Sequence, residues 1–423
     1  MVELHRLSNG IRVVLEPMDY VHSASIGIYI KAGSAYETKQ NNGIAHVVEH
    51  MLFKGTTNKS AKEQAKAFAQ IGGDVNAYTS KEDTCYYTIV LDEYCIEAIT
   101  LLADMLCNAT IEEQELQKEL DVILEEIDMY QDSPEDLAIE HLQEISLPNS
   151  ALGYFISGKK EVVSNFTRCD VIQFIEDFYT ADRIVISIAG HINQTEVLRA
   201  LEENFSNIKR QGKQVIHQKA TFVPNVSFLH KEIEQMHMAM GFLGSGYRQQ
   251  EKYAQAIVSQ CLGESDDSRL FQKLREDLGL AYSVYSFTNT YETMGMFQIY
   301  VAMNSKKIQK TEKEIMLILK DIRREGITQE ELHCAKEQLR ADILMNLDSS
   351  ESRMEQNGKS LLLLGKLDDS KEKVRQLLEV SCEDVNAYIQ RYIQPKHASL
   401  VFVGNQKEMK EDLYMKKDFR ERL

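Results

Sequence analysis

Two stretches of the sequence share one pattern at a spacing of about half the chain. Val171 to Gly190 (VIQFIEDFYTADRIVISIAG) and Val385 to Gly404 (VNAYIQRYIQPKHASLVFVG) align without a gap, and each contains an aromatic helix end, an apolar β run and a final glycine. A second pair, Ile111 to Leu116 (IEEQEL) and Ile327 to Leu332 (ITQEEL), opens a long amphipathic helix at nearly the same offset. The pattern predicts two similar halves of about 210 residues, a period too long for a solenoid.

The length of 423 residues agrees with this division, because a single hydrophobic core stops growing well below that size. The polar stretch 206–219 (SNIKRQGKQVIHQK) is the best candidate for a linker between the halves. We therefore expect a first domain over residues 1–212 and a second, homologous domain over residues 213–423.

Both helices and strands are expected in each half. Apolar and polar residues alternate over Ile11 to Leu15 and over Ser25 to Lys31, which is typical of strands. Lys62 to Gln70 and Glu115 to Tyr130 carry apolar residues at helical spacing instead. The fold class is therefore predicted to be α+β.

Charge and composition exclude several classes of protein. The formal net charge of -17 disfavours nucleic acid as a partner, because the chain would repel phosphates. Such a charge would attract a basic peptide instead. An acidic surface is, however, more often explained by solubility alone. The first residues do not resemble a signal peptide, and no apolar run reaches the length of a membrane span. Seven scattered cysteines without a C-x-x-C pair fit a reducing compartment. We expect a cytoplasmic protein without a membrane partner.

The sequence His46-Val47-Val48-Glu49-His50 has the H-x-x-E-H form, the inverse of the more common H-E-x-x-H zinc motif. On a helix, His46 and His50 are one turn apart on the same face and can share one metal ion. Glu49 lies beside them, where a carboxylate can take a proton from a water molecule without binding the metal itself. The motif predicts a catalytic metal site with Glu49 as the general base.

A third protein ligand is needed, since catalytic zinc sites usually have three and leave the fourth position to water. The predicted helix Glu115 to Tyr130 supplies three candidates, Glu119, Glu125 and Glu126. Glu119 and Glu126 are seven residues apart and share a face, whereas Glu125 points about 100° away from Glu126. Spacing alone does not choose among the three, and a solvated acidic face is the alternative for this helix.

The segment HVVEHMLFKGT, followed by KELDVILEEIDMYQDSPEDL, resembles the pitrilysin-type (inverzincin) zinc metallopeptidases, in particular the mitochondrial-processing-peptidase-like branch. The resemblance extends over essentially the whole chain. It implies that His46, His50 and Glu126 bind zinc and that Glu119 is a supporting carboxylate behind them. Cobalt or manganese are possible substitutes in a site of two histidines and one glutamate.

The resemblance also implies a fold of two homologous halves, each a mixed β-sheet with helices packed on one side, arranged as a clam shell. When the halves are aligned, Ile257 to Cys261 (IVSQC) falls near the position of the metal motif. Two ligand positions and the base are then Ile, Cys and Gln. One metal site per chain is therefore expected, in the first half.

Two further segments resemble substrate-binding motifs of this family. In Ser268 to Tyr285 (SRLFQKLREDLGLAYSVY), which reads as a helix ended by Gly279 and followed by a strand, Arg275 and Tyr282 correspond to residues that reach the scissile peptide. In Gly72 to Ser80 (GGDVNAYTS), the positions of Asn76 and Ala77 correspond to an edge strand that binds the substrate backbone. Without the resemblance, an ordinary surface arginine and a strand tyrosine explain Arg275 and Tyr282 at least as well. A plain hairpin strand after a Gly-Gly turn explains Gly72 to Ser80 better.

The function expected from the motif and the resemblance is that of a zinc-dependent endopeptidase. It would hydrolyse extended peptides or presequence-like segments enclosed between its two halves, with Tyr282 and Arg275 assisting Glu49. The alternative is a non-catalytic structural or partner subunit of a peptidase-like complex, although such chains lose ligands or the Arg and Tyr pair, and this chain has all of them. The resemblance further implies a homodimer.

Overall fold

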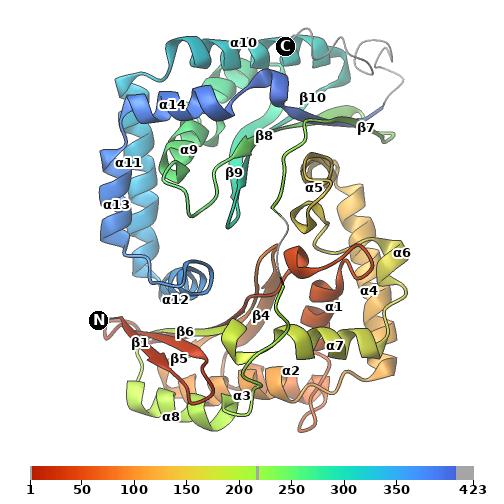
Figure 1. Cartoon of the computed structure of the whole chain (residues 1–423), viewed down its shortest axis with the longest axis vertical. Coiled ribbons are helices and arrows are strands. Elements are labelled where there is room, and N and C mark those ends of the chain that lie inside the picture. Colours follow the sequence, from red (N-terminus) through yellow and green to blue (C-terminus); the bar gives the residue numbers. More distant parts are fainter. Residues whose placement is uncertain (1, 216–218, 406–423) are drawn as a thin grey trace. The chain divides into compact units, whose positions relative to one another are not determined.

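The structure is a computed structural model, and it describes residues 2–215 and 219–405. These residues form two compact units that are interleaved along the chain. The first unit contains residues 2–127, 154–215 and 344–369, and the second contains 128–153, 219–343 and 370–405. Each unit has its own sheet and its own helices (Figure 1).

The first unit is built on a six-stranded mixed sheet with the strand order β1-β2-β6-β3-β5-β4. The pairing of β2 with β6 is parallel, and the other described pairings are antiparallel. Its strands are β1 (Glu3–Arg6), β2 (Arg12–Pro17), β3 (Ser23–Ile30), β4 (Asp74–Thr79), β5 (Thr84–Leu91) and β6 (Ile184–Gly190). Its helices are α1 (Ile44–Met51), α2 (Ala61–Gln70), α3 (Cys95–Cys107), most of α4 (Glu113–Asp132), α6 (Lys160–Val163), α7 (Arg168–Phe178), α8 (Gln194–Phe205) and α12 (Ser350–Lys359).

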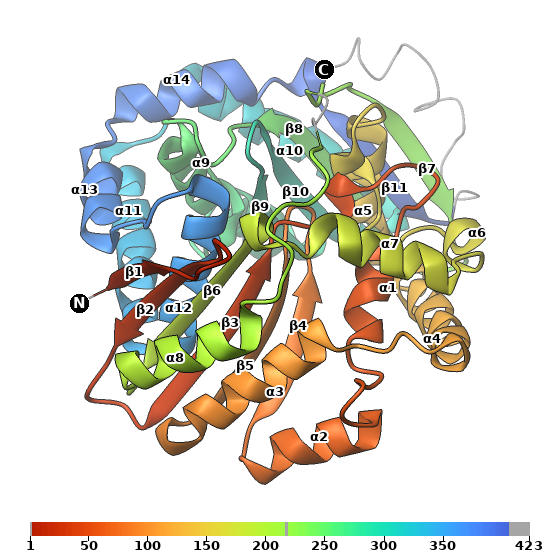
Figure 2. The same cartoon turned by 60° about the horizontal axis from the view of Figure 1, so that its bottom comes forward.

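Strand β3 shows how the sequence divides the two faces of this sheet. Successive side chains of a strand point to opposite faces, so the isoleucines at 26, 28 and 30 share one face, and Ser25, Gly27 and Tyr29 share the other. Helices α3 and α8 lie over one face (Figure 2). Helix α12 packs on the other, where Tyr29 Oη donates to Met354 Sδ and an added Cβ on Gly27 would meet the same sulfur.

The second unit repeats this plan with a five-stranded sheet in the order β7-β11-β8-β10-β9. The pairing of β11 with β7 is parallel, and the other described pairings are antiparallel. Its strands are β7 (Val226–His230), β8 (Gln235–Gly244), β9 (Ala281–Thr290), β10 (Gly295–Asn304) and β11 (Ser399–Gly404). Its helices are α5 (Pro134–Ser146), α9 (Lys252–Ser259), α10 (Ile308–Glu325), most of α11 (Gln329–Met345), α13 (Ser370–Glu379) and α14 (Cys382–Tyr392).

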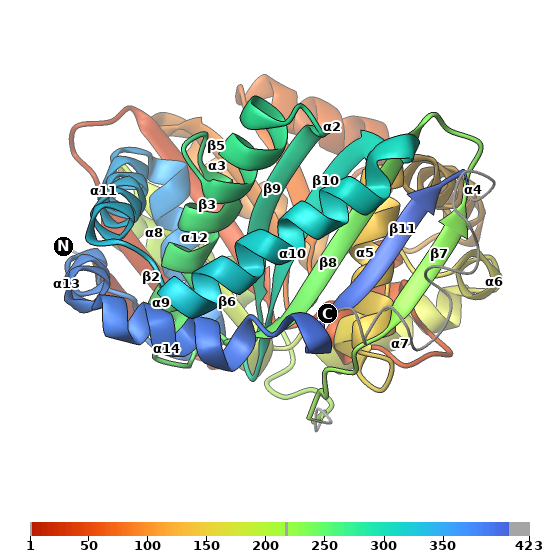
Figure 3. The same cartoon turned by 90° about the horizontal axis from the view of Figure 1, so that it is seen from above.

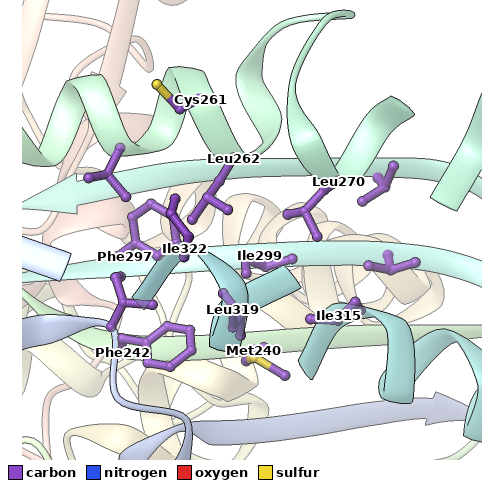
Figure 4. Packing of buried hydrophobic residues seen from close by; sticks show 14 of the residues in the cluster. Met240, Phe242, Cys261, Leu262, Leu270, Phe297, Ile299, Ile315, Leu319 and Ile322 are labelled. Atoms are coloured by element: carbon purple, nitrogen blue, oxygen red, sulfur yellow. The ribbon is translucent and has the colours of Figure 1, made fainter. Parts of the chain in front are cut away.

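Helices α9, α10 and α14 cover one face of the second sheet (Figure 3). Their apolar residues meet Met240 and Phe242 of β8 and Phe297 of β10 in one core, to which Leu319 and Ile322 of α10 contribute (Figure 4). Helix α5 packs on the opposite face. Because helices cover both faces of the central strands, these strands are apolar along their length rather than alternating between apolar and polar residues.

The structure confirms the predicted α+β class and the internal repeat. Helix α7 with β6 corresponds to α14 with β11, each strand ending at a glycine. The long helices α4 and α11 begin within the two copies of the second motif. The two sheet orders agree strand for strand from β2 and β7 onward. The predicted clam-shell arrangement of the halves stays a prediction.

The structure adds two exchanged helices that the sequence did not indicate. Helix α12 follows the long helix of the second half but packs on the first sheet, and α5 follows that of the first half but packs on the second. The predicted linker 206–219 contains positions 216–218, which lie outside the described residues, and its other positions belong to no helix or strand. The domain boundary at residues 212 and 213 stays a prediction, and it does not account for the exchange.

Candidate metal centre

The H-x-x-E-H motif forms the predicted helix, α1. Its apolar residues, among them Val47 and Val48, are buried in the first unit. The helix begins after Gly43, which has a φ of 100° that favours glycine. The rings of His46 and His50 lie 4.6 Å apart, centroid to centroid, as expected for residues one turn apart.

The structure places Glu126, rather than Glu125, beside the two histidines. Glu126 Oε2 lies 3.8 Å from His46 Nε2 and 3.5 Å from His50 Nε2, while Glu125 is exposed. One atom of each of the three residues lies within 4.8 Å of the others. Ligand atoms about 2.05 Å from a tetrahedral zinc ion stand about 3.3 Å apart. The two distances from Glu126 are close to this spacing, and the donor set of two imidazoles and one carboxylate is one that zinc accepts, so these three residues, called the metal group below, fit a zinc ion.

The carboxylate of Glu119 lies beside the ring of His50, and its role as a supporting carboxylate stays a prediction. Its Oε2 lies 3.1 Å from His50 Nδ1, so that Nε2 of the same ring is left for a metal. Its Oε1 forms an ion pair of 2.5 Å with Lys54 Nζ. The sequence analysis missed Lys54, although it follows His50 by four residues, the spacing of one helical turn.

Glu49 is held by strand β4. Thr79 Oγ1, at the end of that strand, donates a hydrogen bond to Glu49 Oε2. Burial raises the pKa of Glu49, although this hydrogen bond opposes the shift. A carboxylate with a raised pKa is a better base, since its proton affinity is closer to that of the groups it must deprotonate. Thr79 is another contact that sequence reasoning did not find, because it joins residues 30 positions apart.

The two histidines have different protonation tendencies. Burial, followed by the neighbouring His50, lowers the pKa of His46 to about 4, so its ring is neutral at pH 7. Burial also acts to lower the pKa of His50, but hydrogen bonds to Glu126 and Glu119 overcome it and raise the pKa. A neutral imidazole is the form that binds a metal, so a bound cation would have to displace the proton that these carboxylates favour on His50.

The residues predicted to bind substrate lie in both units. Asn76 and Ala77 are on β4, whose inner side pairs with β5 and which is the outermost strand of its sheet among the described residues. Tyr282 is on β9 of the second unit, with 77% of its surface exposed. Arg275 is in a π-helical turn, Phe271–Asp277, where its guanidinium lies over the ring of Phe271. The roles of these four residues stay predictions.

Among the described residues of the second unit, no group of side chains corresponds to His46, His50 and Glu126. The segment Ile257 to Cys261 continues α9 into a π-helical turn, and its residues are buried against the helices and strands of that unit. Gln260 Nε2 donates to Glu264 Oε2 at 2.8 Å. Among the described residues, His46, His50 and Glu126 form the one cluster of His, Cys, Asp or Glu that could hold a metal ion.

Comparison with known proteins connects the fold and the metal group to one family. Residues 12–160 match the model of the insulinase family, peptidase family M16, and residues 165–339 match the model described as the peptidase M16 inactive domain. The uncharacterized zinc protease YmxG of Bacillus subtilis strain 168 is 41% identical over 398 residues, covering 94% of this chain and 97% of YmxG.

Solved structures share the fold. A protease from Helicobacter pylori superposes with a TM-score of 0.89 at 23% identity, covering 96% of this chain and 99% of that one. A chain of complex III2 from Candida albicans, with Inz-5 bound, has a TM-score of 0.86 at 18% identity and covers 100% of this chain and 99% of its own length. With both family models matched in order along the sequence and a relative of this identity over nearly the full length, the chain belongs to the insulinase family of peptidases, peptidase family M16.

Proposed function

We propose that the chain is a zinc-dependent endopeptidase that cleaves extended peptides or presequence-like segments. The observation that carries this proposal is the convergence of His46, His50 and Glu126 around one point, with the half-buried carboxylate of Glu49 on the same helix as the two histidines. Relatives named zinc proteases support the choice of metal.

The outer edge of β4 is where we propose that the substrate binds. An edge strand offers unpaired N–H and C=O groups, and an extended peptide can pair with them as an added strand. The hydrogen bond from Thr79 to Glu49 connects the end of β4 directly to the proposed base. A peptide paired along Asn76 and Ala77 would therefore run toward Glu49.

In this proposal the side chains divide the chemistry of hydrolysis among them. His46, His50 and Glu126 would hold zinc, which supplies Lewis acidity to the peptide carbonyl and makes a water molecule more acidic. Glu49 would take the proton from the attacking water and deliver it to the leaving amine. We assign Tyr282 to donation toward the developing oxyanion and Arg275 to a substrate carbonyl.

The test is cleavage of a peptide library with and without a chelator, with cut sites mapped by mass spectrometry. Glu49→Gln should retain the metal and lower kcat by about 10²- to 10⁴-fold, the usual contribution of a general base. Glu93→Gln, at an exposed position in the same unit, is the matched control and should change nothing. Turnover by Glu49→Gln at the wild-type rate would contradict the proposed base.

A non-catalytic subunit is the second candidate, because the second family model is described as an inactive domain and one structural neighbour is part of complex III2. Metal binding without chelator-sensitive cleavage would favour this candidate.

We also propose that the chain forms a homodimer. Light scattering of the purified chain would give the mass of the particle in solution and so test this.

A further inference from the structure

The helix that carries the metal motif begins without a capping side chain of its own. Its N-cap residue is Gly43, and a side chain cannot be added there, because a Cβ would lie 2.8 Å from the carbonyl oxygen of Ser157 and 2.9 Å from the Cα of Gly158. The first N–H groups of a helix have no partner within it and need one from elsewhere. In α1 that partner comes from a residue outside the helix.

The carboxylate of Glu37 fills this place. Its Oε2 accepts hydrogen bonds from the backbone N–H of Gly43 at 2.8 Å and from Asn42 Nδ2 at 2.9 Å, and its Oε1 accepts from the N–H of Ala45 at 2.9 Å. The side chain is buried, with 6% of its surface exposed. The N–H groups and the helix dipole stabilise the ionised form of this carboxyl and offset part of the cost of its burial.

The same loop is fixed to the turn that follows the proposed substrate strand. Just before Glu37, the backbone N–H of Ala35 donates to the carbonyl of Lys81 at 2.7 Å, and that of Ser34 donates to Ser80 at 3.2 Å. Ser80 directly follows Thr79, which holds Glu49. Lys81 is itself buried and lies close enough to Glu37 to favour its ionised form. Glu37 thus joins the start of α1 to the end of β4.

We propose that Glu37 is a positioning residue that sets the metal-binding helix against the substrate strand, by capping α1 from the loop that the turn after β4 holds in place. His46 is one residue beyond Ala45, so the orientation of its ring depends on the first turn that Glu37 closes. The hydrogen bonds of Glu37 go to Asn42, Gly43 and Ala45 and to none of the three metal ligands, so its effect is on how well those ligands are prearranged.

The first test uses the metal-free full chain, so that it does not depend on activity. Hydrogen exchange by mass spectrometry should show that Glu37→Gln speeds the exchange of amides in α1 by about tenfold or more. The glutamine has one carbonyl oxygen in place of two carboxylate oxygens, so it can replace only one of the bonds to the N–H groups of Gly43 and Ala45. Glu37→Ala should have a larger effect. Glu63 provides the matched control, since its carboxylate caps α2 in the same unit and is exposed; Glu63→Gln should affect α2 only.

The second test measures metal affinity and kinetics. Glu37→Gln should raise the Kd for zinc, measured by competition with a chromogenic chelator, by about 10- to 100-fold, as loss of groups that orient ligands usually does. On zinc-saturated protein, kcat should fall while KM stays near its wild-type value. The kinetic arm rests on the proposed peptidase function, whereas the exchange and affinity arms decide the matter even if no peptide is cleaved.

Wild-type exchange in α1 together with wild-type zinc affinity in Glu37→Gln would overturn the proposal. So would an equal acceleration of exchange over the whole first unit, because that would make Glu37 a general stabiliser rather than a residue that positions one helix. Where Glu37→Ala fails to fold, the isosteric Glu37→Gln variant still gives the decisive result.

Discussion

Single side chains around the metal group are connected in pairs that reach far along the sequence. Lys54 contacts Glu119, Glu119 contacts His50, and Thr79 contacts Glu49. The contacts to His50 and Glu49 fix groups that would bind metal or move a proton, and the contact from Lys54 fixes Glu119 beside His50. The chemistry proposed for three ligands and a base therefore depends on residues that carry no such function themselves.

Replacing Glu119 should weaken metal binding without removing any ligand. In Glu119→Gln the side chain loses the charge that attracts the proton of His50 Nδ1, and we expect a 10- to 100-fold loss of zinc affinity. Lys54→Met should give a smaller loss in the same direction, because it removes only the cation paired with Glu119. Chelator competition measures both. Lys66→Met, on the exposed face of α2, should bind zinc as the wild type does, and an equal loss there would refute the connection.

The carboxyl of Glu37 should make stability depend on pH. Burial raises its pKa from the ordinary 4.5 to about 7, despite the hydrogen bonds that it accepts. The folded state therefore favours the protonated form, and its contribution to stability is largest below pH 4.5 and declines as the pH rises through 7. Glu37→Gln does not titrate and lacks one capping hydrogen bond at every pH. The unfolding free energy of the variant minus that of the wild type should therefore rise by up to about 3 kcal/mol between pH 4.5 and 7. Urea unfolding at several pH values measures this difference, and a constant difference would contradict the shift.

Several helices and strands were predicted correctly from the sequence alone. Periodicity identified β2, β3, α2 and α4 to within about two residues, because one buried face leaves a regular pattern. The same reasoning missed the exchange of α5 and α12, since an apolar helix face indicates that it is buried but not which sheet buries it. Lys54, Thr79 and Glu37 were missed for a related reason, because their partners are chosen by the tertiary fold.

Helix α12 should contribute as much to the stability of the first unit as the helices that come from the first half of the sequence. Met354, with 1% of its surface exposed, packs against Tyr29 and lies in a core with Val14, Cys85 and Val185. Met354→Ala should therefore lower the unfolding free energy by about 2–5 kcal/mol. Met345, with 72% of its surface exposed, provides a control in the same segment, and its alanine variant should stay within about 0.5 kcal/mol of the wild type. Denaturant unfolding gives both values, and equal effects would argue against the packing of α12.

At the scale of the whole molecule, the internal repeat favours independent folding of the two halves, whereas the exchanged helices α5 and α12 oppose it. The repeat gives each half its own sheet and its own main helical layer, so each resembles an independent domain. The exchange leaves each half of the sequence without one helix that its sheet requires, since residues 344–369 belong to the first unit and 128–153 to the second. The repeated sequence pattern predicts two similar halves. The exchange of α5 and α12 is known only from the contacts of these helices with the two sheets.

The two halves should therefore depend on each other to fold. A fragment of residues 1–212 lacks α12 and the apolar turn after it, so Tyr29, Val14 and Val185 would be left open to water on one face of the sheet. We expect this fragment to bind a hydrophobic dye and to unfold without a sharp transition, because an exposed apolar face of this kind is costly. Co-expression with residues 213–423 should restore a cooperative transition, since the missing helix is then supplied by the other fragment.

Adding residues 344–369 to the first fragment through a flexible linker should restore part of its ordered structure without the second sheet. This variant separates the need for α12 from a need for the whole second half. Cooperative unfolding and the absence of dye binding by residues 1–212 alone would show that the exchanged helix is dispensable.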